Sequence, residues 1–182
     1  METLITSERI HTALNHIPLI GLMISLVPLV TGLILRDRRM LITALAMCIF
    51  CSGFVLVVMM TGDAAKGHFL GRLSELNLVD SSTREFVEAH EKRADLFGNF
   101  VFGEMIAAMA ALAVVLTKPK RQFFAGWIVV LTTLAALAAL IWVADSGGKI
   151  RHPEFRPSVS SVEPITDLHA PGSTRRGRLT VL

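Results

Sequence analysis

Charged residues are missing from long stretches of this 182-residue chain. Four runs, each longer than 20 residues, lack Asp, Glu, Lys and Arg, with Glu104 as the single exception: 10–35, 40–62, 96–117 and 122–144. Soluble domains of this size carry more charge and interrupt their apolar runs every few residues. A helix needs about 20 apolar residues to cross a bilayer, and it satisfies its own backbone hydrogen bonds there. The sequence therefore predicts an all-α integral membrane protein, an up-down four-helix bundle with spans at about 17–35, 40–61, 96–117 and 122–144.

Several signatures of other protein classes are also absent. Residues 1–9 lack the basic region of a cleavable signal peptide, so the first span is expected to stay in the mature protein. No nucleotide fingerprint, phosphate loop or nucleophile motif supports hydrolase or kinase chemistry. No CxxCH occurs, which excludes an attached c-type haem. The only cysteines, Cys48 and Cys51, fall one turn apart in apolar surroundings and are interpreted as packing residues.

The basic residues gather in loops and near the C-terminus, so the net charge of +3 does not indicate nucleic-acid binding. Loops 36–39 and 118–121 each contain three basic residues, whereas the long segment 62–95 contains five basic and seven acidic ones. The positive-inside rule places the two short loops in the cytoplasm. We therefore expect a multi-pass protein of the bacterial inner membrane with both termini in the periplasm.

Local signals refine the helix boundaries. Residues 7–16 are predicted as a helical lead-in to the first span, in which Pro18 and Pro28 can introduce kinks. Several N-cap residues precede a long third helix at about 83–117. Beyond His152, prolines recur among Ser, Thr and Arg. We therefore predict a transmembrane domain over 1–152 and an extended or disordered tail over 153–182.

Two glycine-containing segments are interpreted as helix ends. Thr61-Gly62-Asp63 is predicted to stop the second span, with an interfacial loop at 64–80. Asp145-Ser146-Gly147-Gly148 is predicted to end the fourth span, and its glycines indicate either a C-cap or a close backbone approach.

The histidines and most other unusual polar residues are predicted to lie at the outer end of the bundle. They flank the outer ends of the four spans: His11, Asn15, His16, Asp63, His68, His90, Glu91, Asp95, Asp145 and His152. His16 lies within an uncharged run, so its ring is expected to face the bundle interior or a partner. His90 shares a helical face with Phe97 and Glu104 and is also expected to face inward.

Three functions for this polar end remain open. In the first, neutral imidazoles from facing helices ligate the iron of a b-type haem. His16 and His90 are the predicted iron ligands, with His11 and His152 as further candidates, and four basic residues could meet the propionates: Lys66, Lys92, Arg93 and Arg151. In the second, histidine and a carboxylate (Asp63, Glu91 or Asp145) bind a metal ion. In the third, a hydrogen-bonded plug only ties the helices together.

Glu104 is the deepest acid, about two turns inside the third span. An ionised carboxylate in lipid is costly, so this side chain is expected to be protonated, paired or facing a polar cavity. It either forms a helix-to-helix hydrogen bond or serves as the carboxylate of a proton relay or quinone site.

The chain resembles a family of uncharacterised bacterial four-helix membrane proteins, catalogued as a domain of unknown function. The resemblance covers residues 10–152 and rests on five pieces: His11, Asn15-His16-Ile17-Pro18, Thr61-Gly62-Asp63, His90-Glu91 and Gly147-Gly148-Lys149-Ile150. Members of that family look like b-type cytochrome anchors, and some are fused to c-type cytochrome domains. The resemblance implies an electron-transfer setting and points to His11, His16 and His90.

These features favour a membrane-embedded b-type haem protein that transfers electrons in a respiratory chain, between quinone and a periplasmic cytochrome c or another membrane-complex subunit. The first alternative is a non-catalytic structural subunit of a larger membrane complex. The second is the His/carboxylate metal site at the outer face. An electron-transfer or accessory subunit is favoured over a stand-alone enzyme.

Overall fold

The computed structural model describes residues 7–75 and 81–152, and every regular element within them is helical. In chain order these are α1 (Ser7–Leu14), α2 (His16–Ile34), α3 (Arg38–Glu75), α4 (Ser81–Thr117), the short 3₁₀ helix η1 (Pro119–Arg121) and α5 (Gln122–Arg151). Four stretches are long and apolar enough to cross a membrane: Arg9–Ile34, Arg38–Arg72, Thr83–Thr117 and Pro119–Ile150. The predicted all-α four-helix membrane bundle is confirmed, and the protein is a multi-pass membrane protein. The tail predicted at 153–182 lies outside the described residues.

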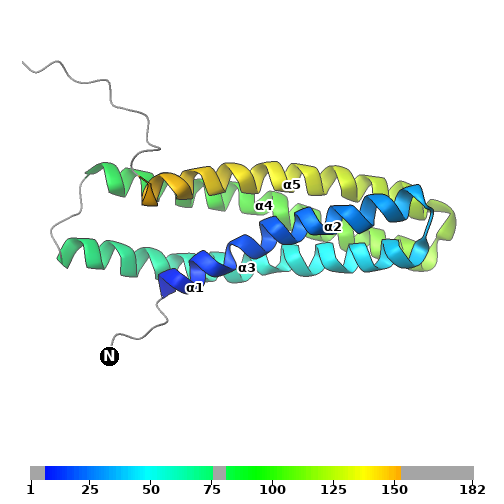
Figure 1. Ribbon diagram of the computed structural model, residues 1–182, viewed down its shortest axis with the longest axis horizontal. Coiled ribbons are helices and arrows are strands. Elements are labelled where there is room, and N and C mark those ends of the chain that lie inside the picture. Colours follow the sequence, from blue (N-terminus) through cyan, green and yellow to red (C-terminus); the bar gives the residue numbers. More distant parts are fainter. Residues whose placement is uncertain (1–6, 76–80, 153–182) are drawn as a thin grey trace, which may run out of the picture.

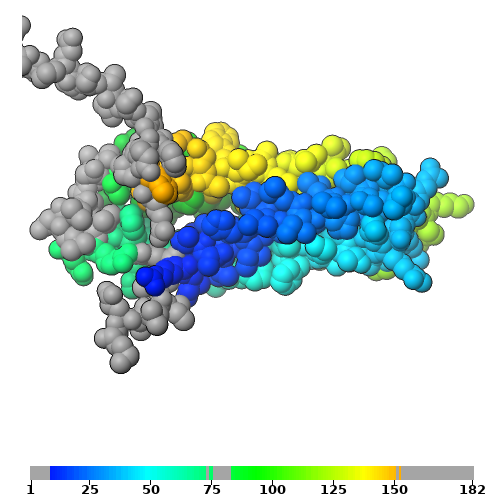
Figure 2. All heavy atoms as spheres, viewed as in Figure 1, coloured from blue at the N-terminus to red at the C-terminus, as the bar shows by residue number. Residues whose placement is uncertain are grey.

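The helices form two hairpins that pack into a ring (Figure 1). One hairpin joins α2 to α3 and the other joins α4 to α5, and both short connections lie at the same end of the bundle. Between the hairpins, α3 packs against α4 and α2 packs against α5. Figure 2 shows α2 lying over the seam between α5 and α3. The short-loop pairs are therefore antiparallel neighbours, as expected for an up-down bundle.

The predicted helix stop at Thr61-Gly62-Asp63 is wrong, and of the two interpretations of Gly147-Gly148 the C-cap is wrong, whereas Gly147 does make a close approach, to His90. Helix α3 continues through Thr61-Gly62-Asp63 to Glu75, and α5 continues through Asp145-Ser146-Gly147-Gly148 to Arg151. The burial of Ala65 shows that tertiary packing sustains α3 beyond Gly62, and Ser146 is buried in the turn of α5 that leads into Gly147-Gly148. An isolated glycine costs a helix only about 1 kcal/mol, which such packing offsets.

Pro18 accounts for the break between α1 and α2. A proline has no N–H to donate and its ring crowds the carbonyl four residues earlier. That carbonyl belongs to Leu14, the last residue of α1, and Asn15 separates the two helices. Pro28 lies inside α2, which continues to Ile34. The predicted lead-in is thus a separate short helix.

The turn between α2 and α3 is closed by local bonds. Arg36 adopts a left-handed conformation with φ of 54°. The Asp37 Oδ1 atom accepts hydrogen bonds from the backbone N–H groups of Arg39 at 2.8 Å and Met40 at 3.2 Å, at the start of α3. These N–H groups have no partner within the helix, so Asp37 acts as a cap.

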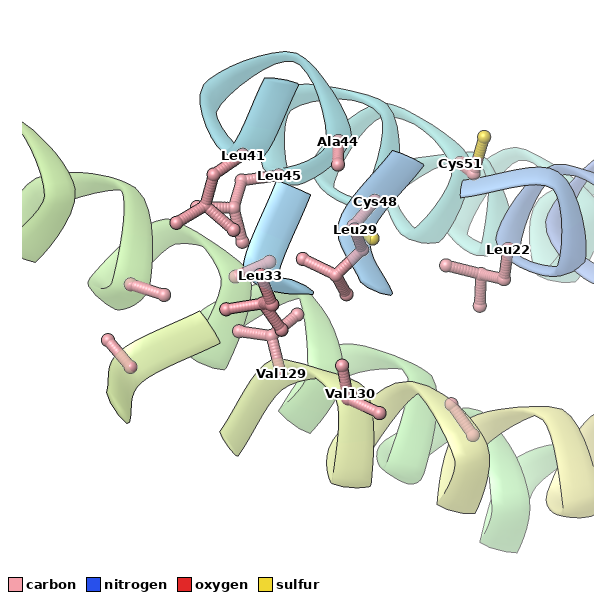
Figure 3. Close-up of a cluster of buried hydrophobic side chains, with 14 of the residues drawn as sticks. Leu22, Leu29, Leu33, Leu41, Ala44, Leu45, Cys48, Cys51, Val129 and Val130 are labelled. Atoms are coloured by element: carbon pink, nitrogen blue, oxygen red, sulfur yellow. The ribbon is translucent and has the colours of Figure 1, made fainter. Parts of the chain in front are cut away.

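The apolar core lies toward the loop end of the bundle and joins α2, α3, α4 and α5 (Figure 3). Leucines of α2 and α3 meet valines of α5 there: Leu22, Leu29, Leu33, Leu41, Leu45, Val129 and Val130. Small residues allow close approach, because a Cβ at Gly126 would lie 2.6 Å from a methyl carbon of Leu33. Large apolar side chains such as Phe50 and Met60 face outward, as lipid contact requires.

The two helix pairs diverge toward the end opposite the short loops. There α1 packs against α3 and the start of α2, and within the described part of the chain it contacts neither α4 nor α5. Figure 1 shows α1 and α3 lying apart from α4 and α5 at this end and converging with them toward the loops. The predicted polar end is thus the open end of the bundle.

Candidate functional site

Helix α1 holds His11 against α3 at the open end. The His11 Nδ1 atom lies 3.1 Å from the Val58 carbonyl oxygen and 3.2 Å from Thr61 Oγ1. The ring contacts the backbone at Gly62, where a Cβ would lie 3.2 Å from His11 Cε1. Gly62 therefore lets the imidazole approach the helix closely.

Helix α4 holds His90 against α5 in the same manner. The His90 Nδ1 atom lies 2.9 Å from Ser146 Oγ, and the ring is also within hydrogen-bonding reach of the Val143 carbonyl. A Cβ at Gly147 would lie 3.1 Å from His90 Cε1. His11 and His90 both lie at the open end of the bundle, one from each half of the chain, and the electrostatic influence of His11 reaches His90.

The two halves repeat one arrangement. In each, the first helix or helix pair supplies a histidine, a short basic loop follows, and the second helix supplies the acceptors. The acceptors have the same spacing: a valine carbonyl, a hydroxyl three residues later and a glycine next to it (Val58, Thr61, Gly62 and Val143, Ser146, Gly147). We call each such trio a histidine seat.

The hydrogen-bond pattern fixes which ring nitrogen carries the proton. The Thr61 hydroxyl donates to carbonyls of its own helix, at 2.9 Å to Val57 and 3.0 Å to Val58, and the Ser146 hydroxyl donates to the Val143 carbonyl at 2.6 Å. Each hydroxyl has only one proton, so each histidine Nδ1–H must be the donor to its seat. In a neutral imidazole Nε2 then keeps a free lone pair. Neither Nε2 has a hydrogen bond within residues 7–75 and 81–152.

Of the two orientations expected for His16, toward the bundle interior or toward a partner, the first is wrong. Its side chain is exposed, and its Nδ1 lies 2.8 Å from the Thr12 carbonyl one turn earlier. The structure brings His90 together with His11, not with His16. The helix is interrupted at Asn15, whose side chain is exposed. This interruption places His11 in α1 and His16 in α2. The signal missed in the sequence is the repeated Thr-Gly and Ser-Gly pair after the second and fourth apolar runs.

The remaining candidates do not join this pair. His68 and His152 are exposed, and the side chain of Arg151 lies outside the described part of the chain. Phe97 stacks on Phe100 at 5.7 Å and contacts Trp142 at 4.8 Å, and the half-exposed Phe100 and Trp142 place this aromatic cluster on the outside of α4 and α5.

Two of the three candidate carboxylates at this end form ion pairs with basic side chains. Asp63 is exposed, while Glu91 pairs with Lys66 at 2.5 Å. Asp145 pairs with Lys149 at 2.6 Å and lies 3.9 Å from Arg93. Among the residues that the structure describes, no three His, Cys, Asp or Glu side chains group so that they could hold a metal ion. The geometry thus gives the His/carboxylate metal site no support.

A second polar cluster surrounds Glu104 deep in the membrane. Glu104 is fully buried; one carboxyl oxygen contacts Ser52 Oγ and the other lies 3.1 Å from Thr133 Oγ1. Cys48 also contacts this carboxyl, and Ser25 reaches Cys48. Polar atoms from α2, α3, α4 and α5 therefore meet at one level.

The contacts at Glu104 favour the helix-to-helix hydrogen bond over a proton relay. Both carboxyl oxygens have hydroxyl partners, and no cation pairs with Glu104 in the described ranges. An unpaired buried charge would cost several kcal/mol, so the side chain is a neutral acid. Fourteen residues separate Glu104 from His90, a rise of roughly 21 Å along α4. The buried acid and the histidine pair are separate sites.

Comparisons with known proteins do not extend this description. No protein-family model, no curated protein and no solved structure matches the chain.

Proposed function

We propose that this protein binds haem b with His11 and His90 as the axial ligands of the iron, and that it transfers electrons. The supporting observation is the pair of histidine seats. Each seat accepts a hydrogen bond from the Nδ1–H group of its histidine, so both Nε2 lone pairs are left free at the open end of the bundle. Hydrogen bonding of Nδ1 to a carbonyl is the usual outer-shell arrangement of a metal-bound histidine.

The surroundings of the pair suit a flat macrocycle. Gly62 and Gly147 set both imidazoles back against the helices, and α1 leaves α4 and α5 without contact at this end within the described residues. Axial haem ligands come from two sides of the ring, and here each half of the chain supplies one. The residues present therefore fit the group.

Cations at the same end would bind the propionates. Lys66 and Arg93 are partly exposed and already face carboxylates, Glu91 and Asp145. Propionates would share these cations. Lys92 is exposed and could contribute from the rim.

Bound haem would supply a one-electron iron couple, and the protein would supply ligands, orientation and an apolar surround. Thr61 and Ser146 would hold the two imidazoles in the tautomer that presents Nε2. The proposed setting is the bacterial inner membrane, with this end periplasmic because the opposite loops are basic. Quinone and a cytochrome c, or another subunit of a membrane complex, are the proposed partners.

The absorption spectrum of the protein tests this proposal. We expect detergent-purified protein from a haem-replete host to show the Soret and α/β bands of a six-coordinate, bis-imidazole haem. The H11Q and H90Q variants should each lose this low-spin spectrum, because each removes one axial ligand.

The matched controls are H16Q and H68Q, since both side chains are exposed and lie outside the pair. They should keep the wild-type spectrum. Protein that carries no haem, or haem whose spectrum survives in both H11Q and H90Q, would contradict the proposal. A loss in H16Q with retention in H11Q would replace the ligand assignment by the pair expected from the sequence.

A further inference from the structure

Apart from the exposed Arg39, the cations at the loop end of the bundle fall into two groups. Arg38 donates to the carbonyls of Val115 and Leu116 at 3.3 and 3.4 Å, where α4 approaches its end, and Arg36 lies over the Phe123 ring at 6.0 Å. The guanidinium groups of both arginines therefore have partners within the protein. The acid of the same loop, Asp37, is also engaged, because it caps α3.

The second group of cations lies in the loop between α4 and α5, and no acidic side chain of the described residues neutralises its positive charge. Lys118, Lys120 and Arg121 are exposed and have no hydrogen-bonding or ion-pairing side-chain partner within the described residues. Together with Pro119 they line a shallow hollow of about 420 Å³. Pro119 and the 3₁₀ turn η1 hold the three cations within four consecutive residues. Like charges this close repel one another unless an anion lies between them.

The position of the hollow identifies the kind of anion. It lies where the apolar surface of the bundle ends: Leu116 on the last turn of α4 and Phe124 on the first turn of α5 are exposed, Phe124 by 73%. The helical stretch that is long and apolar enough to span a membrane begins at Pro119, in η1, and continues through α5. Cations at that depth meet lipid headgroups, and large apolar side chains beside them meet acyl chains.

We infer that Lys118, Lys120 and Arg121 bind the phosphodiester headgroup of an anionic glycerophospholipid, whose acyl chains run along the outer faces of α4 and α5 beside Leu116 and Phe124. A free phosphate shares the headgroup chemistry, but it would make no contact with the apolar surface. This lipid site lies at the opposite end from the histidine pair and does not depend on it.

Native mass spectrometry of the detergent-purified full chain tests the inference. Phosphatidylglycerol and phosphatidylcholine with identical acyl chains are titrated separately, and inorganic phosphate is the third probe. Each cation near a lipid surface contributes about fivefold in affinity. We therefore expect phosphatidylglycerol to bind on the order of 100-fold more tightly than phosphatidylcholine, and the K118Q/K120Q/R121Q variant to lose that preference.

The matched control is R72Q/R84Q/K92Q, which removes three exposed cations from the other end and should keep the preference. Equal affinity for the two lipids, or an equal loss in both triple variants, would overturn the inference. Inorganic phosphate that binds as tightly as phosphatidylglycerol would replace the lipid by a free anion. Circular dichroism of both variants verifies that they are folded.

Discussion

A methyl group at Gly62 or Gly147 would press against the neighbouring imidazole, at 3.2 and 3.1 Å from its Cε1 atom. Both distances are tighter than an ordinary carbon contact, so each glycine is needed for its histidine to lie where it does. The sequence suggests Gly62 as part of a helix stop, and Gly147 as either a C-cap or a point of close backbone approach. Their role is close approach of a ring, not termination of a helix.

Glu104 permits a test at the scale of one residue. The E104Q variant keeps the shape and both hydrogen bonds of a neutral acid, so we expect its free energy of unfolding to fall by about 1 kcal/mol or less. The E104A variant leaves a cavity and two buried hydroxyls without their partner, which should cost about 2–4 kcal/mol. Detergent-induced unfolding followed by far-UV circular dichroism measures both values. Equal destabilisation of the two variants would show that Glu104 is charged.

At the scale of the helix, the N-terminal cap of α3 can be tested by mutation. Asp37 accepts two backbone N–H bonds at the start of this helix. The D37A variant should lose about 1 kcal/mol of unfolding free energy, because both N–H groups lose their acceptor. D37N retains an acceptor oxygen and should stay within a few tenths of a kcal/mol of the wild type. The same unfolding titration measures both, and a D37A variant as stable as D37N would contradict the capping role.

The helices themselves could be predicted because their cause is local. Uncharged runs of the length needed to cross a bilayer identify all four spans, and the long helix expected at 83–117 is observed as Ser81–Thr117. Where the helices end was not predictable, because Ala65 and Ser146 sustain α3 and α5 through packing against other elements. Local residue preferences contain no information about such contacts.

The site was predictable only in part for the same reason. Burial of Glu104 and the inward position of His90 follow from residues on one helical face. The choice between His11 and His16 depends on which of them meets α3. That choice is set by the break before Pro18 and by the space at Gly62, features of two segments about 50 residues apart.

At the scale of the whole molecule, the orientation in the membrane can be tested with single cysteines. The native thiols, Cys48 and Cys51, are buried and should not react. We expect D63C, at the histidine end, to react with a membrane-impermeant maleimide in intact cells. K120C, in the basic loop, should react only after permeabilisation, because the positive-inside rule places that loop in the cytoplasm. The opposite labelling pattern would invert the proposed topology.

The repeated histidine seat has a consequence for biogenesis. Each half of the chain, α1–α3 and α4–α5, contains one histidine together with its own carbonyl, hydroxyl and glycine, so each can orient its imidazole before the other half is made. Membrane helices insert first and associate afterwards. If the two histidines bind haem as proposed, the first half of the chain to leave the ribosome would hold one ligand, and the set would become complete only when the second half docks beside it. Cofactor capture would then serve as a checkpoint that only a fully inserted chain can pass.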